Sequence, residues 1–325
     1  MAEFAADYAL FVAQLITVLG LLLIAALLFV GISRRGVQPD GLEVQHLNRQ
    51  LEEHADVLRR AVHGKERFKK LLKARAKDRK KEKKAESSER GRVYVLDFKG
   101  DLRASAAQSL RHEVSAVLAV ATERDIVFVR LENSGGTVHD HGFAASQLVR
   151  IRKQGIPLYV AVDKVAASGG YLMACVADRI IAAPFAIIGS IGVLAQLPNF
   201  NRLLESKGIE FEQISAGRYK RTLTMFGKNT EEGREKLKEE LTEVHELFKR
   251  QIAEHRPQVD VEAVATGEHW YGARALELKL IDEIASSDDW LLAAARERDI
   301  YKVTYKRRRN LSERVLGGIE SVLSR

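Results

Sequence analysis

The stretch Ala166-Ala167-Ser168-Gly169-Gly170-Tyr171 closely follows an apolar run, Ile156-Pro157-Leu158-Tyr159-Val160-Ala161-Val162. The apolar run predicts a buried strand, and the small residues after it predict a junction with a following helix. A serine at such a junction has no bulky neighbours, so backbone N–H groups can approach a substrate beside it. The pattern makes Ser168 a candidate nucleophile for acyl transfer.

The sequence on both sides of this junction alternates between short apolar runs and amphipathic segments. Strands are predicted at 93–98, 126–131, 157–162 and 179–183, and helices at 104–122, 143–153 and from about 168. Strands separated by helices imply crossover connections, and crossovers make neighbouring strands parallel. The region therefore belongs to the α/β class.

The sequence beyond this region also predicts ordered structure. The apolar run at 180–197 is interrupted by Pro184 and several small or polar residues, so we expect a strand and a buried loop there and not a membrane span. A long amphipathic helix is predicted at 231–254, short helices between 260 and 297, and a last strand at 301–305.

An apolar segment at 9–32 predicts a membrane anchor. As a helix its 24 residues extend about 36 Å, enough to cross a hydrocarbon core of about 30 Å. A cleaved signal peptide is the alternative, but the tail at 1–8 is acidic and holds no Lys or Arg. We expect an uncleaved anchor, and Arg34-Arg35 after it favour a cytoplasmic location for the bulk of the chain.

The segment at 33–91 predicts a polar, helix-prone and strongly basic connector. Residues 59–84 carry a net charge of +11, whereas the whole chain carries +8, so the remainder sums to about −3. We expect a solvated helix or tether, which can also attract anionic lipid head groups beside the membrane. Nucleic-acid binding is disfavoured because Phe68 is the one aromatic residue of the run that could stack on a base.

The chain has a single cysteine, Cys175, which excludes an internal disulfide and a cysteine-based metal cluster. Cys175 lies about two helical turns past Ser168 in an apolar context. We therefore expect Cys175 to pack in the core and not to act as a catalytic thiol.

A serine hydroxyl becomes an effective nucleophile when a base takes its proton and N–H donors stabilise the oxyanion. The donor candidates are Gly169 and the pair Gly135-Gly136, which follows the strand at 126–131. In a parallel sheet this pair opens at the same carboxyl edge as the strand before Ser168.

The identity of the base is open on these grounds. His139 and His141 follow the glycine pair and could serve as base, as metal ligands or as exposed loop residues. His269 could complete an α/β-hydrolase-like triad, although the strict first glycine of that motif is absent. A lysine is the other possibility, provided that desolvation lowers its pKa toward neutrality.

Three ordered motifs resemble those of the signal peptide peptidase A family of serine peptidases, family S49. They are Lys164-Val165-Ala166-Ala167-Ser168-Gly169-Gly170-Tyr171, Gly189-Ser190-Ile191-Gly192-Val193 and Ser215-Ala216-Gly217-Arg218-Tyr219-Lys220. The anchor, the connector and Thr266-Gly267-Glu268-His269-Trp270-Tyr271-Gly272 are similar to the bacterial SohB branch. The likeness covers nearly the whole chain.

The resemblance implies a role for each matching residue. Ser168 would be the nucleophile and Lys220 the general base of a serine-lysine dyad. Ser190 would hydrogen-bond the lysine and hold it toward the serine. The N–H groups of Gly136 and Gly169 would form the oxyanion hole.

The resemblance also implies an architecture and a location. It predicts a ClpP/crotonase-like fold of stacked ββα units at 92–306, a basic tail at 307–325 and a ring-like homo-oligomer with its sites facing an interior bowl. The enzyme would be a single-pass protein of the bacterial inner membrane that cleaves flexible, largely apolar peptides such as signal peptide remnants. It would need no cofactor and no metal.

One departure concerns the loop Asn133-Ser134-Gly135-Gly136, where the family usually has Ser-Pro-Gly-Gly. Replacing the proline by Ser134 frees one φ angle and returns a backbone N–H, so we expect a less rigid loop.

Two other functions compete with the peptidase. A crotonase-like acyl-CoA enzyme would share the fold and the oxyanion hole without a serine-lysine dyad. A non-enzymatic membrane scaffold would use the basic connector and the helix at 231–254 to gather partners.

Overall fold

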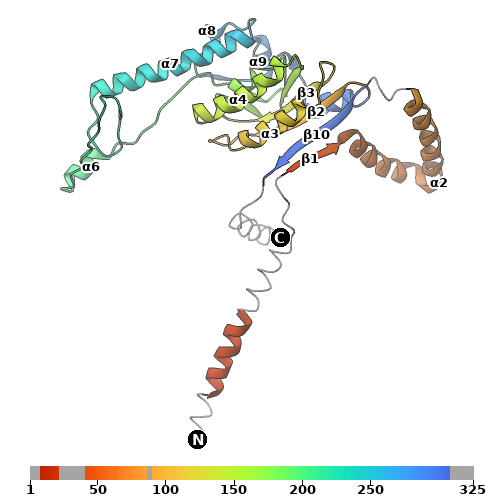
Figure 1. Ribbon diagram of the computed structural model, residues 1–325, viewed down its shortest axis with the longest axis horizontal. Coiled ribbons are helices and arrows are strands. Elements are labelled where there is room, and N and C mark those ends of the chain that lie inside the picture. The colour runs from red at the N-terminus through yellow and green to blue at the C-terminus, as the bar shows by residue number, and fades with distance from the viewer. Residues whose placement is uncertain (1–7, 22–40, 86–89, 308–325) are drawn as a thin grey trace. The chain divides into compact units, whose positions relative to one another are not determined.

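The computed structural model describes residues 8–21, 41–85 and 90–307. Residues 44–304 form one compact unit, which contains the core and the candidate site (Figure 1). Residues 8–21 are helical, and within the described ranges no helix is both long and apolar enough to cross a membrane. The remainder of the predicted anchor, 22–32, lies outside the described residues, as does nearly all of the predicted tail at 307–325.

The larger sheet of this mixed α/β fold has seven strands in the order β1-β10-β2-β3-β4-β6-β9. In that order the strands are Gly41–His46, Asp299–Lys306, Arg92–Lys99, Ile126–Glu132, Leu158–Val162, Arg179–Ala182 and Glu283–Ile284. Strands β10 through β9 pair in parallel. The parallel sheet predicted from the alternation of strands and helices is therefore confirmed.

A smaller sheet holds β5 (Val165–Ala167), β7 (Ile187–Gly189) and β8 (His269–Tyr271). Strand β5 pairs with β7 in parallel, and β7 pairs with β8 in antiparallel. Strands β4 and β6 of the large sheet are thus each followed by a short strand of the small sheet. This second sheet lies directly under the candidate nucleophile, since β5 ends at Ala167.

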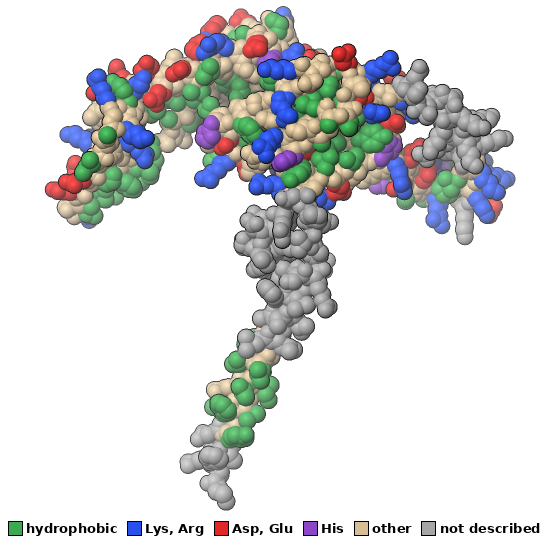
Figure 2. Space-filling model, viewed as in Figure 1, with side chains coloured by type: hydrophobic (Ala, Val, Ile, Leu, Met, Phe, Trp, Pro, Cys, Tyr) green, Lys and Arg blue, Asp and Glu red, His purple; other side chains and the backbone are tan. Residues whose placement is uncertain are grey.

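The helices connect and cover these strands. They are α2 (Leu47–Ala85), α3 (Ala107–Leu118), α4 (Val138–Lys153), α5 (Gly169–Ala174), α6 (Asn201–Ser206), α7 (Glu231–His255), α8 (Val261–Val264), α9 (Gly272–Glu277) and α10 (Ser287–Ala294). Helices α3 and α4 pack against each other and against the large sheet (Figure 1). Helix α7 carries side chains of both charges on its outer surface (Figure 2).

The large sheet is buried on both faces. Along β2, Tyr94, Leu96 and Phe98 belong to the main hydrophobic core, whereas Val93 and Val95 belong to a second core on the opposite face. This division follows from the two-residue repeat of a strand. Continuous apolar runs are typical of parallel strands because both faces are covered.

Several elements differ from the sequence prediction. The segment at 33–91, expected to be a helical connector, contains strand β1 before helix α2, and α2 is kinked at Gly64. Helix α4 begins at Val138 instead of 143, so it includes the two histidines expected in a loop. The region between 260 and 297 holds β8 and β9 in addition to its short helices.

Candidate active site

Ser168 sits at the turn from β5 into α5 in a strained backbone conformation. Its φ of 51° and ψ of −121° lie in a region that residues other than glycine rarely occupy. The turn is held by two hydrogen bonds, from Ser168 N to the Gly189 carbonyl at 2.8 Å and from Leu172 N to the Ser168 carbonyl at 2.9 Å. This conformation changes the direction of the chain abruptly and leaves Ser168 on the wall of a cavity.

The loop with Gly135-Gly136 lies directly against Ser168. A Cβ added to Gly135, whose φ is 88°, would come within 2.7 Å of the Ser168 Cβ and 2.8 Å of the Gly169 nitrogen. A Cβ on Gly136 would meet the Leu102 carbonyl oxygen at 2.1 Å. Glycine is therefore required at both positions, and the two backbone segments expected to meet at this edge of the sheet do so.

Ser190 belongs to the same cavity. It follows β7, which pairs with β5 so that Gly189 lies opposite Ala167. Ser190 also has a positive φ of 51°, and its N–H donates to the Glu268 carbonyl at 2.6 Å. The two serines thus share a positive φ directly after neighbouring parallel strands.

The cavity has a volume of about 1230 Å³. Ser168, Gly136, Gly169 and Ser190 all line it. Its apolar walls come from α4, α5 and α7, with the side chains of Ala145, Val149, Leu172, Val244, Leu247 and Phe248. Four of the five residues predicted for the site are therefore brought together beside an apolar trough.

Lys220, the fifth predicted residue, is not among the described residues that line this cavity. It lies in an irregular segment before α7, its side chain is exposed, and its N–H donates to the Gly217 carbonyl at 3.1 Å. The neighbouring Arg218 and Tyr219 both contact Glu232 on α7. This arrangement fixes the segment near the start of α7.

The three histidines considered as bases have different surroundings. His141 is fully buried and packs beneath the glycines of the site, whereas the His139 side chain is 82% exposed and faces Asp140. His269 is exposed on β8 and does not line the cavity. Among the described residues, no set of three or more His, Cys, Asp or Glu side chains converges as metal ligands would.

Sequence reasoning missed His245 on α7. Its Nε2 atom is buried and has no hydrogen-bond partner in the described part of the chain, and the residue lines the cavity. A substrate group could supply the missing partner, because an unpaired buried polar atom is costly. The signal in the sequence is its position beside Val244 and Phe248 on the apolar stripe of the helix.

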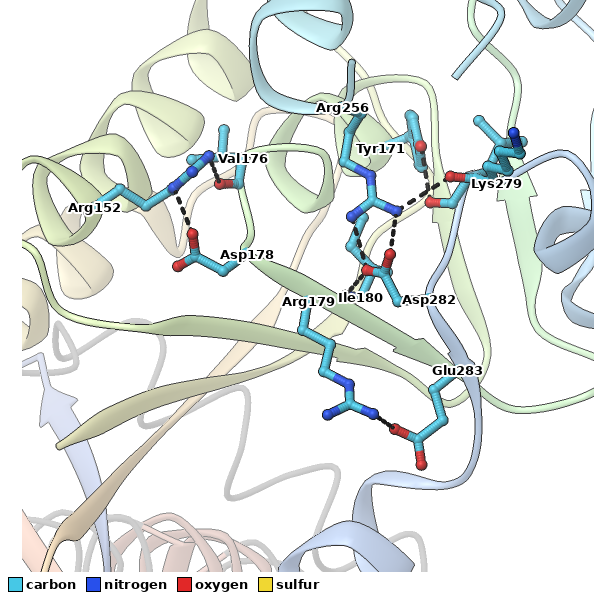
Figure 3. A network of polar contacts seen from close by, with 11 residues as sticks. Arg152, Tyr171, Val176, Asp178, Arg179, Ile180, Arg256, Lys279, Asp282 and Glu283 are labelled. Atoms are coloured by element: carbon cyan, nitrogen blue, oxygen red, sulfur yellow. Dashed lines mark hydrogen bonds and ion pairs between the residues drawn. The ribbon is translucent and has the colours of Figure 1, made fainter. Parts of the chain in front are cut away.

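A buried polar network supports the helix that follows Ser168 (Figure 3). The Tyr171 hydroxyl donates to the Leu280 carbonyl at 2.9 Å, and burial raises the pKa of this phenol well above its usual value, so it stays a donor. Arg256 is 2% exposed and donates two hydrogen bonds of 2.7 Å to Asp282. Asp282 also accepts from the Ile180 N–H at 2.7 Å. Helix α5 and the end of α7 are thereby fixed to one segment, 279–282.

Known proteins resemble this chain along almost its full length. Two family models match the chain. The model described as "Peptidase family S49 N-terminal" matches residues 3–148, and the model described as "Peptidase family S49" matches residues 150–301. A protein of Haemophilus influenzae described as "Probable protease SohB" is 44% identical over 316 residues, covering 94% of this chain and 90% of that protein. A protein of Buchnera aphidicola with the same description is 54% identical over 233 residues, covering 72% and 69%.

Among solved structures, the 1510-N membrane-bound stomatin-specific protease in complex with a substrate peptide has a TM-score of 0.46 and 13% identity. The match covers 71% of this chain and 99% of that chain. The relative from Haemophilus, by contrast, shares 44% of its residues across nearly the whole chain. On that similarity and the two family matches, the chain is a SohB-type peptidase and belongs to peptidase family S49.

Proposed function

We propose that this peptidase is a serine endopeptidase with Ser168 as its nucleophile. The observation that carries the proposal is the close approach of the Gly135-Gly136 backbone to a strained, cavity-lining Ser168. Backbone N–H groups beside a serine can stabilise the negative charge of a tetrahedral intermediate. We assign this role to the N–H groups of Gly136 and Gly169.

Lys220 is the proposed base. As a neutral amine it takes the proton of the Ser168 hydroxyl while the oxygen attacks the substrate carbonyl carbon. The protonated lysine then gives this proton to the leaving amine, and an acyl-enzyme remains. Water attacks the ester after losing a proton to the same lysine, which releases the acid and regenerates the serine. Ser190 hydrogen-bonds the lysine and orients it.

We propose that Lys220 reaches Ser168 from a neighbouring copy in a ring-like homo-oligomer. The lysine is exposed and lies outside the cavity of its own chain. A lysine works as a base in its neutral form, which burial favours. Contact with another subunit would provide that burial and bring the amine to a cavity that already holds the other four groups.

The proposed substrates are extended, largely apolar peptide segments such as signal peptide remnants. The support is the apolar trough between α4 and α7, which begins at Ser168 and is lined by Val149, Leu172 and Phe248. Burial of apolar side chains there would favour binding and offset the freedom that the peptide loses. The unpaired Nε2 of His245 would hydrogen-bond a polar atom of the peptide.

A membrane anchor at 9–32 is the proposed means of localisation to the bacterial inner membrane. The described helix at 8–21 exposes a continuous apolar surface (Figure 2). Apolar side chains of this kind favour lipid over water. Deletion of 9–32 should move the protein from the membrane fraction to the soluble fraction of a cell lysate.

Mixed oligomers test the proposed active site. Ser168→Ala and Lys220→Ala should each abolish hydrolysis of an apolar fluorogenic peptide. Their co-expression in equal amounts should restore about a quarter of wild-type activity, because that share of random neighbour pairs combines an intact serine with an intact lysine. Co-expression of Ser168→Ala with the double variant Ser168→Ala/Lys220→Ala is the matched control and should stay inactive.

The results that would overturn the proposal are equally specific. Full activity of Lys220→Ala would remove the lysine from the mechanism, and full activity of Ser168→Ala would remove the serine. Two inactive single variants without recovery in the mixture would place the dyad within one chain.

A further inference from the structure

Two buried polar residues, Asn133 and His141, connect the backbone segments that face Ser168. Asn133 is 1% exposed and His141 is fully buried. We propose that they are positioning residues, which hold the Gly135-Gly136 loop in the geometry that stabilises the oxyanion. This inference rests on the proposed serine mechanism and assigns it two further residues.

The backbone of Asn133 joins the oxyanion loop to the strand that leads to Ser168. Its N–H donates to the Val165 carbonyl at 2.9 Å, and its carbonyl accepts from the Ala167 N–H at 3.0 Å. These two bonds form a parallel bridge between Asn133 and β5. The start of the loop therefore has a fixed position relative to the serine.

The Asn133 side chain holds the next part of the loop. Its Oδ1 accepts a hydrogen bond from the Gly135 N–H at 2.9 Å, which stabilises the turn in which Gly135 has a φ of 88°. Its Nδ2 lies 3.4 Å from the Met173 sulfur on α5. One amide group thus contacts both the loop and the helix that begins after Ser168.

His141 contacts the amide group of Asn133. Its Nε2 is 3.2 Å from Asn133 Oδ1, and its Nδ1 is 2.9 Å from the Thr137 carbonyl oxygen. Both neighbouring oxygens are acceptors, so either ring nitrogen can donate to its neighbour when it carries the hydrogen. Since His141 and Thr137 belong to the first turn of α4, the contact connects the loop to that helix.

The glycines after the nucleophile fit tightly on this pair. A Cβ on Gly169 would lie 2.5 Å from the His141 ring, and a Cβ on Gly170 would lie 2.1 Å from the Asn133 carbonyl oxygen. The pair therefore contacts both backbone segments that carry the proposed donors, at Gly135 in the loop and at Gly169 after the nucleophile. A shift of Asn133 or His141 would move the two donors relative to each other.

This arrangement explains how the loop can be ordered without a proline. A proline at 134 would restrict φ covalently. Ser134 lacks that restriction, and the hydrogen bond from the neighbouring Gly135 to Asn133 holds the turn instead. The Asn133 side chain has room because Gly100 has no Cβ, which would lie 2.4 Å from Asn133 Oδ1.

Three variants separate positioning from folding. Asn133→Leu has a similar size but no acceptor, and it should lower kcat about 10- to 100-fold while KM changes less than about threefold. Asn133→Ser keeps an uncharged acceptor oxygen that can bond the Gly135 N–H in the same kind of turn, and it should stay within about threefold of the wild-type kcat. His141→Phe keeps a ring under Gly169 without its nitrogens and should lower kcat about 3- to 30-fold.

Hydrogen exchange of the loop amides gives a measurement that needs no activity. In Asn133→Leu the amide of Gly135 should exchange at least about tenfold faster than in the wild type, because its acceptor is gone. Leu110→Ala, a buried truncation on α3, is the matched control. It should lose stability and leave both kcat and the exchange of the Gly135 amide unchanged.

The outcomes distinguish this inference from the function on which it rests. If Ser168→Ala is as active as the wild type, the serine mechanism fails and the positioning role fails with it. If Ser168→Ala is inactive but Asn133→Leu keeps the wild-type kcat and slow exchange at Gly135, the positioning role alone is overturned. A kcat for Asn133→Ser as low as that for Asn133→Leu would also overturn it.

Discussion

Burial determines the chemistry of Cys175, the residue that ends α5. The thiol is fully buried and faces the Leu172 carbonyl at 3.3 Å, and burial raises its pKa to about 12. Because the thiolate is the reactive form, we expect iodoacetamide to leave the folded protein unmodified at pH 8 and to alkylate it fully in denaturant. Mass spectrometry measures both states. Rapid labelling of the folded protein would contradict the prediction.

Individual residues could be predicted from the sequence where a short motif determines the backbone. Ser168 and the glycines of the loop follow from such motifs, Ser190 follows from the family resemblance, and all of them line one cavity. His141 was expected in a loop because the residues around it are polar and do not show the apolar period of a helix. Helix α4 nevertheless begins at Val138, where the Thr137 hydroxyl donates to Asp140. The position of the Lys220 side chain depends on contacts between segments distant in the sequence, which no local pattern contains.

At the scale of elements, Arg256 and Asp282 connect the end of α7 to the large sheet. Replacing Asp282 by Ala would leave the guanidinium of Arg256 buried without a counter-charge and remove the acceptor of the Ile180 N–H. We expect a loss of about 3–5 kcal/mol in the free energy of unfolding. Urea denaturation followed by circular dichroism measures this change.

The matched control lies beside this pair in Figure 3. Arg179 and Glu283 form an ion pair of 2.6 Å whose side chains are 45% and 35% exposed. Arg179→Ala should therefore cost less than about 1 kcal/mol. Equal losses in the two variants would show that burial does not determine the contribution of the pair.

Element length determined which secondary structure could be predicted. The strands of the large sheet from β2 to β6 and the 25-residue helix α7 contain enough residues to show a period. Strands β5, β7 and β9 have three residues or fewer, too few for any pattern. They are defined by their pairing with other strands, β5 with β7 and β9 with β6, and β5 is the strand that positions the nucleophile.

At the scale of the whole molecule, Asp97 joins three segments that are distant in the sequence. On β2 it accepts two hydrogen bonds from Arg130 on β3, at 2.6 and 2.8 Å, and it lies 2.6 Å from Lys302 on β10. Burial alone would raise the pKa of Asp97, but the hydrogen bonds and charges of Arg130 and Lys302 outweigh it and lower the pKa. The carboxylate therefore helps to hold the last strand in the sheet.

The lowered pKa gives the stability of the fold a defined pH dependence. The contribution of the Asp97 carboxylate is fully present above the ordinary pKa of about 3.9 and is lost as the pH falls through the lower folded value. Asp97→Asn should therefore be less stable than the wild type at pH 7, and the difference should shrink below about pH 4. Urea denaturation between pH 7 and pH 2.5 measures it. In a Lys302→Met background the same substitution should have a smaller effect at pH 7, whereas a difference that grows toward low pH would contradict the assignment.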